Sequence, residues 1–120
     1  MKQLIRIGFY RELAHGTPDG ESLHDVVHQR SGPDEALLVR YLRAGAILIA
    51  SPAMVRDVLA NNAMIGSLEI RTDGTFAWPS DLPHYVERHH ARVPDELLRH
   101  ACSLGFAIPT TVDISQLEFA

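Results

Sequence analysis

Alternation of apolar and polar residues near the start of the chain predicts a β-strand. Between positions 3 and 10, Ile5, Ile7 and Phe9 recur at every second position, a spacing that gives a strand one apolar face. A second strand is expected at positions 46–50, where Ala-Ile-Leu-Ile-Ala forms a continuous apolar run. Such a run is typical of a strand buried on both faces.

Apolar residues at helical spacing predict five helices. The first follows Ser22, which forms a variant of the capping box with Asp25. A proline begins the second, third and fifth helices, because its missing N–H costs nothing in the first turn. The expected helix starts are Ser22, Pro33, Pro52, either Ser80 or Asp81, and Pro94. Gly45 and Gly105 are expected to end the second and fifth helices.

The clearest local pattern is a β-hairpin centred on Asp73 and Gly74. The pair lies between two short apolar segments at 67–71 and 76–78, and Asp-Gly is typical of a type I′ turn, in which both residues have positive φ. The tail at 108–114 is a candidate for a last strand. The element order is then β-α-α-β-α-β-β-α-α, with an optional final β.

This order predicts a single α+β domain at 1–120, a two-layer sandwich whose mixed sheet is covered mainly on one face. A chain of 120 residues, 46% hydrophobic and 22% charged, has the composition of a globular domain with one core. The expected core comprises Ile5, Ile7, Leu38, Tyr41, Leu42, Ile47, Ile49, Val58, Trp78, Val86, Leu97 and Leu98.

The net charge and the lengths of the apolar runs indicate the cellular location of the protein and the partners that it can bind. The net charge of −4, with 11 basic residues, argues against non-specific nucleic-acid binding, since that needs clustered positive charge. The apolar runs are too short for a signal peptide or a membrane span. Cys102 is the single cysteine and suits a reducing compartment. We therefore expect a cytoplasmic protein that binds neither nucleic acid nor membrane, with Cys102 buried in the last helix.

The histidines are the first candidates for chemistry, because the chain contains seven of them. His24 and His28 are four residues apart on the first predicted helix, a spacing that zinc sites use. The neighbouring sequence supplies no third ligand, so a solvent-exposed helix face is the competing interpretation. The motifs of P-loops, dinucleotide-binding folds and serine hydrolases are absent from the sequence. We predict no cofactor and no catalytic residue.

The segment at 72–85 is dense in residues that favour binding. One interpretation is structural: a hairpin delivers Trp78 to the start of a helix, and Trp and Tyr fill the core. The other places Trp78, Asp81, His84 and Tyr85 at the rim of a binding surface, since Trp and Tyr are frequent interface anchors. Helical spacing predicts that Asp81, Arg88 and Arg92 point away from the inward stripe and are available to a partner.

The same segment, continued through Tyr85-Val-Glu-Arg88 and Val93-Pro-Asp-Glu96, resembles an uncharacterised family of small bacterial proteins. The family is frequent in actinobacteria and shares the pattern TDG-x-W-x-WPSDL-x-YYVE-x-Y. The stretches at 11–13 and 41–45 are similar to the same group. Phe76 stands where the pattern has an aromatic residue, often Trp, and His84 stands where it has Tyr.

Some relatives in that family resemble immunity proteins that neutralise secreted toxins. The resemblance implies a non-enzymatic, protein-binding domain, an immunity-like antitoxin that acts on a toxin partner by occlusion. The alternative, from a different class of protein, is a small metal-dependent or His-assisted hydrolase that uses His24, His28 and other histidines.

Overall fold

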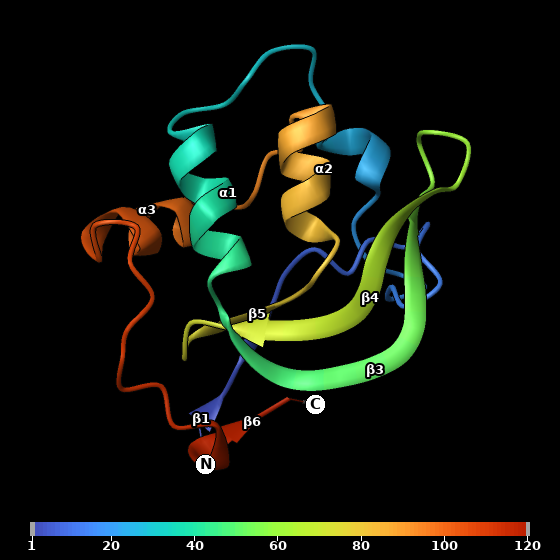
Figure 1. Ribbon diagram of the computed structural model, residues 1–120. Helices are drawn as coiled ribbons and strands as arrows, with labels where there is room; N and C mark the ends of the chain where they lie inside the picture. The colour runs from blue at the N-terminus through green and yellow to red at the C-terminus, as the bar shows by residue number, and fades with distance from the viewer. Residues whose placement is uncertain (1, 120) are drawn as a thin grey trace.

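Two sheets and three α-helices make up the computed structural model, which describes residues 2–119 (Figure 1). The helices are α1 (Glu35–Arg43), α2 (Leu82–His89) and α3 (Asp95–Ser103), with 3-10 turns η1 (Leu23–Asp25) and η2 (Ile114–Gln116). The strands are β1 (Lys2–Gln3), β2 (Ile5–Arg6), β3 (Ala46–Asp57), β4 (Ala63–Thr72), β5 (Phe76–Pro79) and β6 (Leu117–Glu118).

The larger sheet is mixed and has the strand order β2-β5-β4-β3. Strand β4 is antiparallel to both β3 and β5, whereas β2 runs parallel to β5. Near the two termini, β1 and β6 form a separate parallel pair. Helices α1 and α2 lie on one side of the larger sheet (Figure 1). The predicted α+β class is therefore confirmed. Among residues 2–119, no helix has the length and hydropathy needed to cross a bilayer.

The main core lies between the helices and β5, and Trp78 is at its centre. The Trp78 side chain is fully buried and stacks against Tyr41, with 6.2 Å between the ring centroids. Its indole N–H donates to the Leu42 carbonyl at 3.0 Å. Gly45 is required here, because a Cβ at that position would lie 2.7 Å from Cζ2 of Trp78. The close approach of the indole, and not the positive φ expected of a helix-ending glycine, explains Gly45.

Strand β3 is one continuous 12-residue element, so the predicted helix starting at Pro52 is wrong. Pairing with β4 extends to Asp57 and overrides the local helical pattern. The ladder is irregular between Ala50 and Met54, and this irregularity accommodates Pro52, which has no N–H to donate. Residues 46–50 of β3 are exposed or half-buried, so this segment is not buried on both faces as predicted.

Four predicted core residues are exposed instead: Ile5, Ile47, Ile49 and Val58 are each 40–44% exposed. Leu98 is half-buried, and Cys102, which was expected to be buried, is exposed. The other predicted core residues are buried as expected, namely Ile7, Leu38, Tyr41, Leu42, Trp78, Val86 and Leu97.

The predicted first helix reduces to the single turn η1. The Ser22 cap is present, since its hydroxyl accepts from the His24 N–H at 3.2 Å. Tertiary hydrogen bonds then redirect the chain: the Val26 carbonyl accepts from the Arg92 N–H at 2.9 Å, and the His28 N–H donates to the His89 carbonyl at 3.2 Å. These backbone groups are no longer available for a longer helix.

The hairpin of β4 and β5 is confirmed, with Thr72 paired to Ala77, but its turn is not type I′. Gly74 has a φ of 96°, whereas Asp73 does not have positive φ. Oδ1 of Asp73 instead accepts the N–H groups of Thr75 and Phe76 at 2.9 and 2.8 Å. The aspartate side chain therefore stabilises this turn directly.

The ends of the chain also differ from the prediction. The strand expected at 3–10 divides into β1 and β2, which pair in different sheets and end before Gly8, a glycine with a φ of 78°. The final strand is β6 and does not lie within 108–114. Helix α3 begins after Pro94 and ends before Gly105, which has a φ of 64°, so both predicted ends of this helix are confirmed.

Glu12 fixes the loop that precedes η1 through two hydrogen bonds, and their contribution to stability is expected to depend on pH. Its carboxylate accepts from the Ser22 hydroxyl and from the Leu23 N–H. Burial raises the pKa of Glu12, but these hydrogen bonds outweigh burial and lower it below its usual 4.5. Glu12→Gln should lower the free energy of unfolding by about 1.5 kcal/mol at pH 7.

A lowered folded-state pKa means that this contribution is complete above pH 4.5 and is lost as the pH falls through the folded-state value. Urea denaturation at several pH values should therefore show the difference between wild type and Glu12→Gln shrinking below pH 4.5. A difference that stays constant down to the acid-unfolding limit would contradict this role.

Candidate binding surface

The β3–β4 hairpin exposes most of the large apolar side chains that the protein leaves open to solvent. In the part of the chain that the structure describes, the exposed large hydrophobic residues are Ile5, Leu37, Ile47, Ile49, Met54, Val58, Met64 and Ile114. Five of these eight lie on β3, on β4 or between them. Contiguous exposed apolar patches mark interaction sites, which makes this hairpin the first surface to consider.

The chemistry of this hairpin favours binding to an apolar surface. Met54 and Met64 are 50% and 51% exposed, and methionine adapts its shape to irregular partners. From Ala46 to Val55 the strand carries no charged residue, although edge strands are commonly protected by charged side chains. The hairpin therefore presents a neutral, adaptable and largely apolar surface.

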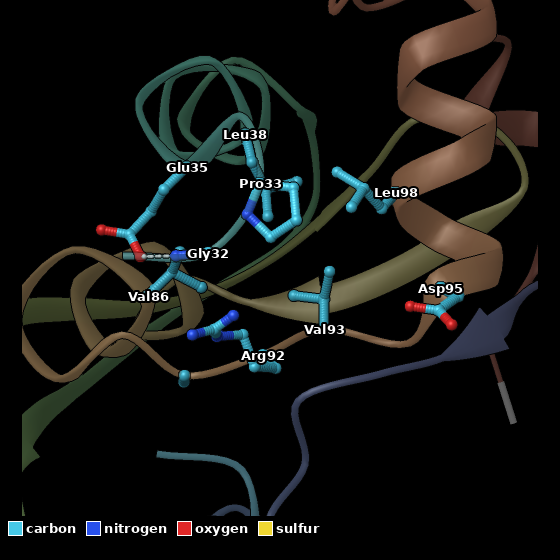
Figure 2. Close-up of a pocket in the computed structure, with 10 residues that line it drawn as sticks. Gly32, Pro33, Glu35, Leu38, Val86, Arg92, Val93, Asp95 and Leu98 are labelled. Carbon is cyan, nitrogen blue, oxygen red and sulfur yellow. Dashed lines mark hydrogen bonds between the residues drawn. The ribbon is translucent and has the colours of Figure 1, made fainter. Parts of the chain in front are cut away.

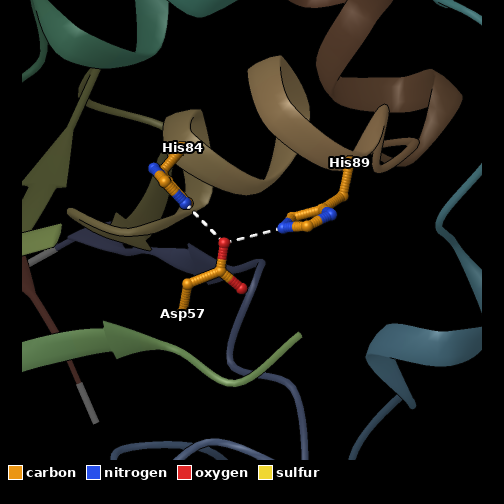
Figure 3. A group of neighbouring side chains, drawn as sticks. All are labelled: Asp57, His84 and His89. Atoms are coloured by element: carbon orange, nitrogen blue, oxygen red, sulfur yellow. Dashed lines mark hydrogen bonds and ion pairs between the residues drawn. The ribbon is translucent and has the colours of Figure 1, made fainter. Parts of the chain in front are cut away.

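Asp57 anchors the far end of β3 to helix α2. Its carboxylate is 3% exposed, and Oδ2 lies 2.7 Å from Nε2 of both His84 and His89 (Figure 3). Its Oδ1 accepts from the Leu59 N–H at 2.9 Å. Burial raises the pKa of Asp57, but the hydrogen bonds from the two imidazoles and from Leu59 outweigh it and hold the pKa below its usual value.

Tyr85 holds the backbone on both sides of this carboxylate. Its hydroxyl donates to the Arg56 carbonyl at 3.1 Å and accepts from the Val58 N–H at 3.0 Å. The pKa of Tyr85 is raised to about 12, mainly by burial, so the hydroxyl keeps its proton at neutral pH. The end of the hairpin is thus fixed to α2 through both its backbone and a side chain.

Three of the predicted binding residues are in the core and not at a rim. Trp78, Asp81 and Tyr85 are each 0% exposed, as the structural interpretation of the segment at 72–85 expects for Trp78 and Tyr85. Asp81 was expected to point outward, but the start of α2 turns it inward. Its Oδ2 lies 2.9 Å from Nε2 of His15, within ion-pair distance but without hydrogen-bond geometry.

The other predicted residues occupy different environments. Arg88 is exposed, as expected. Arg92 is half-buried, because its guanidinium reaches back to donate to the Arg30 carbonyl at 2.9 Å. His24 and His28 are exposed but do not share a helix face, since no helix continues past η1. Within residues 2–119, the group of three side chains with metal-ligand atoms close together is instead Asp57, His84 and His89.

A cavity of about 230 Å³ lies where α1, α2 and the start of α3 meet (Figure 2). Leu38, Val86 and Leu98 are among the apolar residues that line it. The Glu35 carboxylate on its edge already accepts from the Gly32 N–H at 3.0 Å and contacts His90 Nδ1 at 2.9 Å. This cavity is smaller than most small-molecule sites.

The candidate surface is therefore the exposed hairpin, with Asp57 and Tyr85 holding its far end. The sequence pattern missed Asp57 because 27 and 32 residues separate it from the histidines that contact it. The alternation of Ile47 and Ile49 within an uncharged run was the one available signal for the hairpin. In comparisons with protein-family models, with curated proteins and with solved structures, nothing matches this chain.

Proposed function

We propose that this protein is a non-enzymatic binding domain that contacts a protein partner through the exposed residues of the β3–β4 hairpin. The observation that carries the proposal is the concentration of exposed apolar side chains on this one element. Protein interfaces combine an apolar centre, often containing methionine, with a polar rim. Met54 and Met64 supply such a centre, and Arg56, which pairs with Met64 across the ladder, is an exposed charge available to a rim.

We further propose that the partner is a toxin and that the domain acts as an immunity-like antitoxin. The resemblance of the segment at 72–96 to a bacterial family with immunity-like relatives supports this class. Inhibition by occlusion needs a complementary surface and no catalytic group. The net charge of −4 favours a basic partner, because complementary charge speeds association.

Charged substitutions on the hairpin test this function. Met54→Glu combined with Met64→Glu should weaken binding to a candidate toxin encoded beside this gene by at least about 100-fold, the loss expected when two central residues are disrupted. Ile114→Glu is the matched control, since Ile114 is 39% exposed and lies outside the hairpin. Binding is measured by calorimetry, and neutralisation by the growth of cells that express the toxin.

Thermal melts accompany both variants, because exposed substitutions should change stability by no more than about 0.5 kcal/mol. Wild-type neutralisation by the hairpin variant would contradict the proposed surface. Breakdown of the toxin at substoichiometric amounts of the domain would contradict a non-enzymatic mode of action.

The alternative hydrolase has weaker support. Its proposed ligands, His24 and His28, belong to a single 3-10 turn and the loop that follows it. Nδ1 of His28 contacts the Val26 carbonyl at 2.8 Å, so this nitrogen is already engaged by the backbone and is not free to bind a metal. A hydrolase that depends on this pair therefore has no preformed site at these residues.

A further inference from the structure

We propose that Asp57, His84 and His89 form a binding site for one zinc ion where the end of the hairpin meets α2. Each side chain offers one ligand atom, and the three atoms lie within 4.8 Å of one another. The carboxylate comes from the end of β3, and the two imidazoles reach it from α2 on either side (Figure 3). This site is independent of the proposed partner.

The distances are close to those that zinc imposes. Zinc binds imidazole nitrogen and carboxylate oxygen at about 2.0–2.2 Å in a tetrahedron, so neighbouring ligand atoms are about 3.3 Å apart. In the protein, Oδ2 of Asp57 lies 2.7 Å from each Nε2. Each pair must separate by about 0.6 Å to admit the ion. The histidine side chains are 23% and 24% exposed, so their rings have room to move.

Zinc would replace hydrogen atoms that now hold the group together. An ionised carboxylate accepts hydrogen bonds but donates none, so both Nε2 atoms carry the hydrogen that points at Asp57. On binding, each Nε2 gives up this hydrogen and offers its lone pair to the ion. A ring that was neutral takes the proton up on Nδ1, and a ring that was protonated releases one proton to solvent. The ion then bridges Oδ2 of Asp57 and the two nitrogens that already face it.

The carboxylate is positioned before any ion arrives. The Leu59 N–H holds Oδ1 of Asp57, and the Tyr85 hydroxyl holds the residues on either side of it. Outer-shell hydrogen bonds of this kind orient metal ligands. Two imidazoles and one carboxylate suit zinc, whereas calcium and magnesium prefer oxygen ligands alone. Three protein ligands with partly exposed rings leave a fourth position for water.

The other histidine–acid contacts of residues 2–119 lack this arrangement. They join one histidine to one carboxylate each: His15 to Asp81, His90 to Glu35, and His100 to Asp73. A pair supplies two ligand atoms, one fewer than the three that catalytic zinc sites use. In contrast, the Asp57 carboxylate contacts two imidazoles, those of His84 and His89.

Calorimetric titration of untagged, chelator-treated protein with zinc chloride tests the site. We expect one zinc ion per chain. His84→Ala and His89→Ala should each weaken binding by at least about 100-fold, since loss of a ligand should cost no less than loss of its outer-shell partner. His100→Ala is the matched control, because His100 is 30% exposed and also faces a buried carboxylate. It should bind zinc as the wild type does.

Cobalt(II) bound to the wild-type protein provides a second measurement that needs no variant. A four-coordinate site gives an intense visible absorption, which zinc should abolish by displacement. Absence of zinc binding, or the weak spectrum of six-coordinate cobalt, would overturn the site. Wild-type affinity in the His84→Ala/His89→Ala double variant would overturn it as well, as would loss of binding in His24→Ala or His28→Ala.

Discussion

Trp78→Ala is expected to lower the free energy of unfolding by about 3–5 kcal/mol, as removal of a buried tryptophan usually does. The side chain is fully buried, and its indole N–H donates to the Leu42 carbonyl. Truncation would leave a cavity beside Tyr41 and remove the shorter hydrogen bond to the Leu42 carbonyl, which would keep only its longer one from the Gly45 N–H at 3.5 Å. Guanidinium chloride denaturation followed by circular dichroism measures the loss.

Trp78→Phe is the control for this experiment. It keeps an aromatic ring in the core but removes the hydrogen bond to Leu42. It should therefore lower the free energy of unfolding by less than the alanine variant does. An unchanged denaturation midpoint in Trp78→Ala, together with weaker partner binding, would instead place this side chain in an interface.

Leu42→Ala should cost about 2–5 kcal/mol, because Leu42 is 0% exposed in the middle of the main core. Leu37→Ala is the matched control: it makes the same chemical change on the same helix, at a residue that is 37% exposed. The control should remain within about 0.5 kcal/mol of the wild type. Equal losses in the two variants would show that the buried face of α1 has been misassigned.

Short-range patterns predicted the helices and the hairpin at 72–77 well. The expected inward stripe of α2 includes Leu82, Tyr85 and Val86, all of which are buried. Helical spacing alone identifies such a stripe, because residues three and four apart share a face. The hairpin at 72–77 was equally predictable, since Asp73 and Gly74 favour a turn through their own backbone and side-chain chemistry.

Strand β3 shows where local patterns fail. Pro52 followed by Val55 and Val58 satisfies a helix start and an apolar helical face. Pairing with β4 on both sides of the irregularity at 50–54 supplies backbone hydrogen bonds that a short helix cannot match. The side chains of Ile47 and Ile49 are exposed on this strand, so the apolar run that suggested a buried strand is part of the candidate binding surface.

The sequence by itself determined the α+β class, the β4–β5 hairpin, helices α1 to α3 and the buried stripe of α2, because each depends on residues close together in the chain. The tertiary structure alone decided the length of β3, the burial of Asp81 and the meeting of Asp57 with His84 and His89. Those features depend on contacts between segments far apart in sequence. Local periodicity carries no information about which distant residue will face a given side chain.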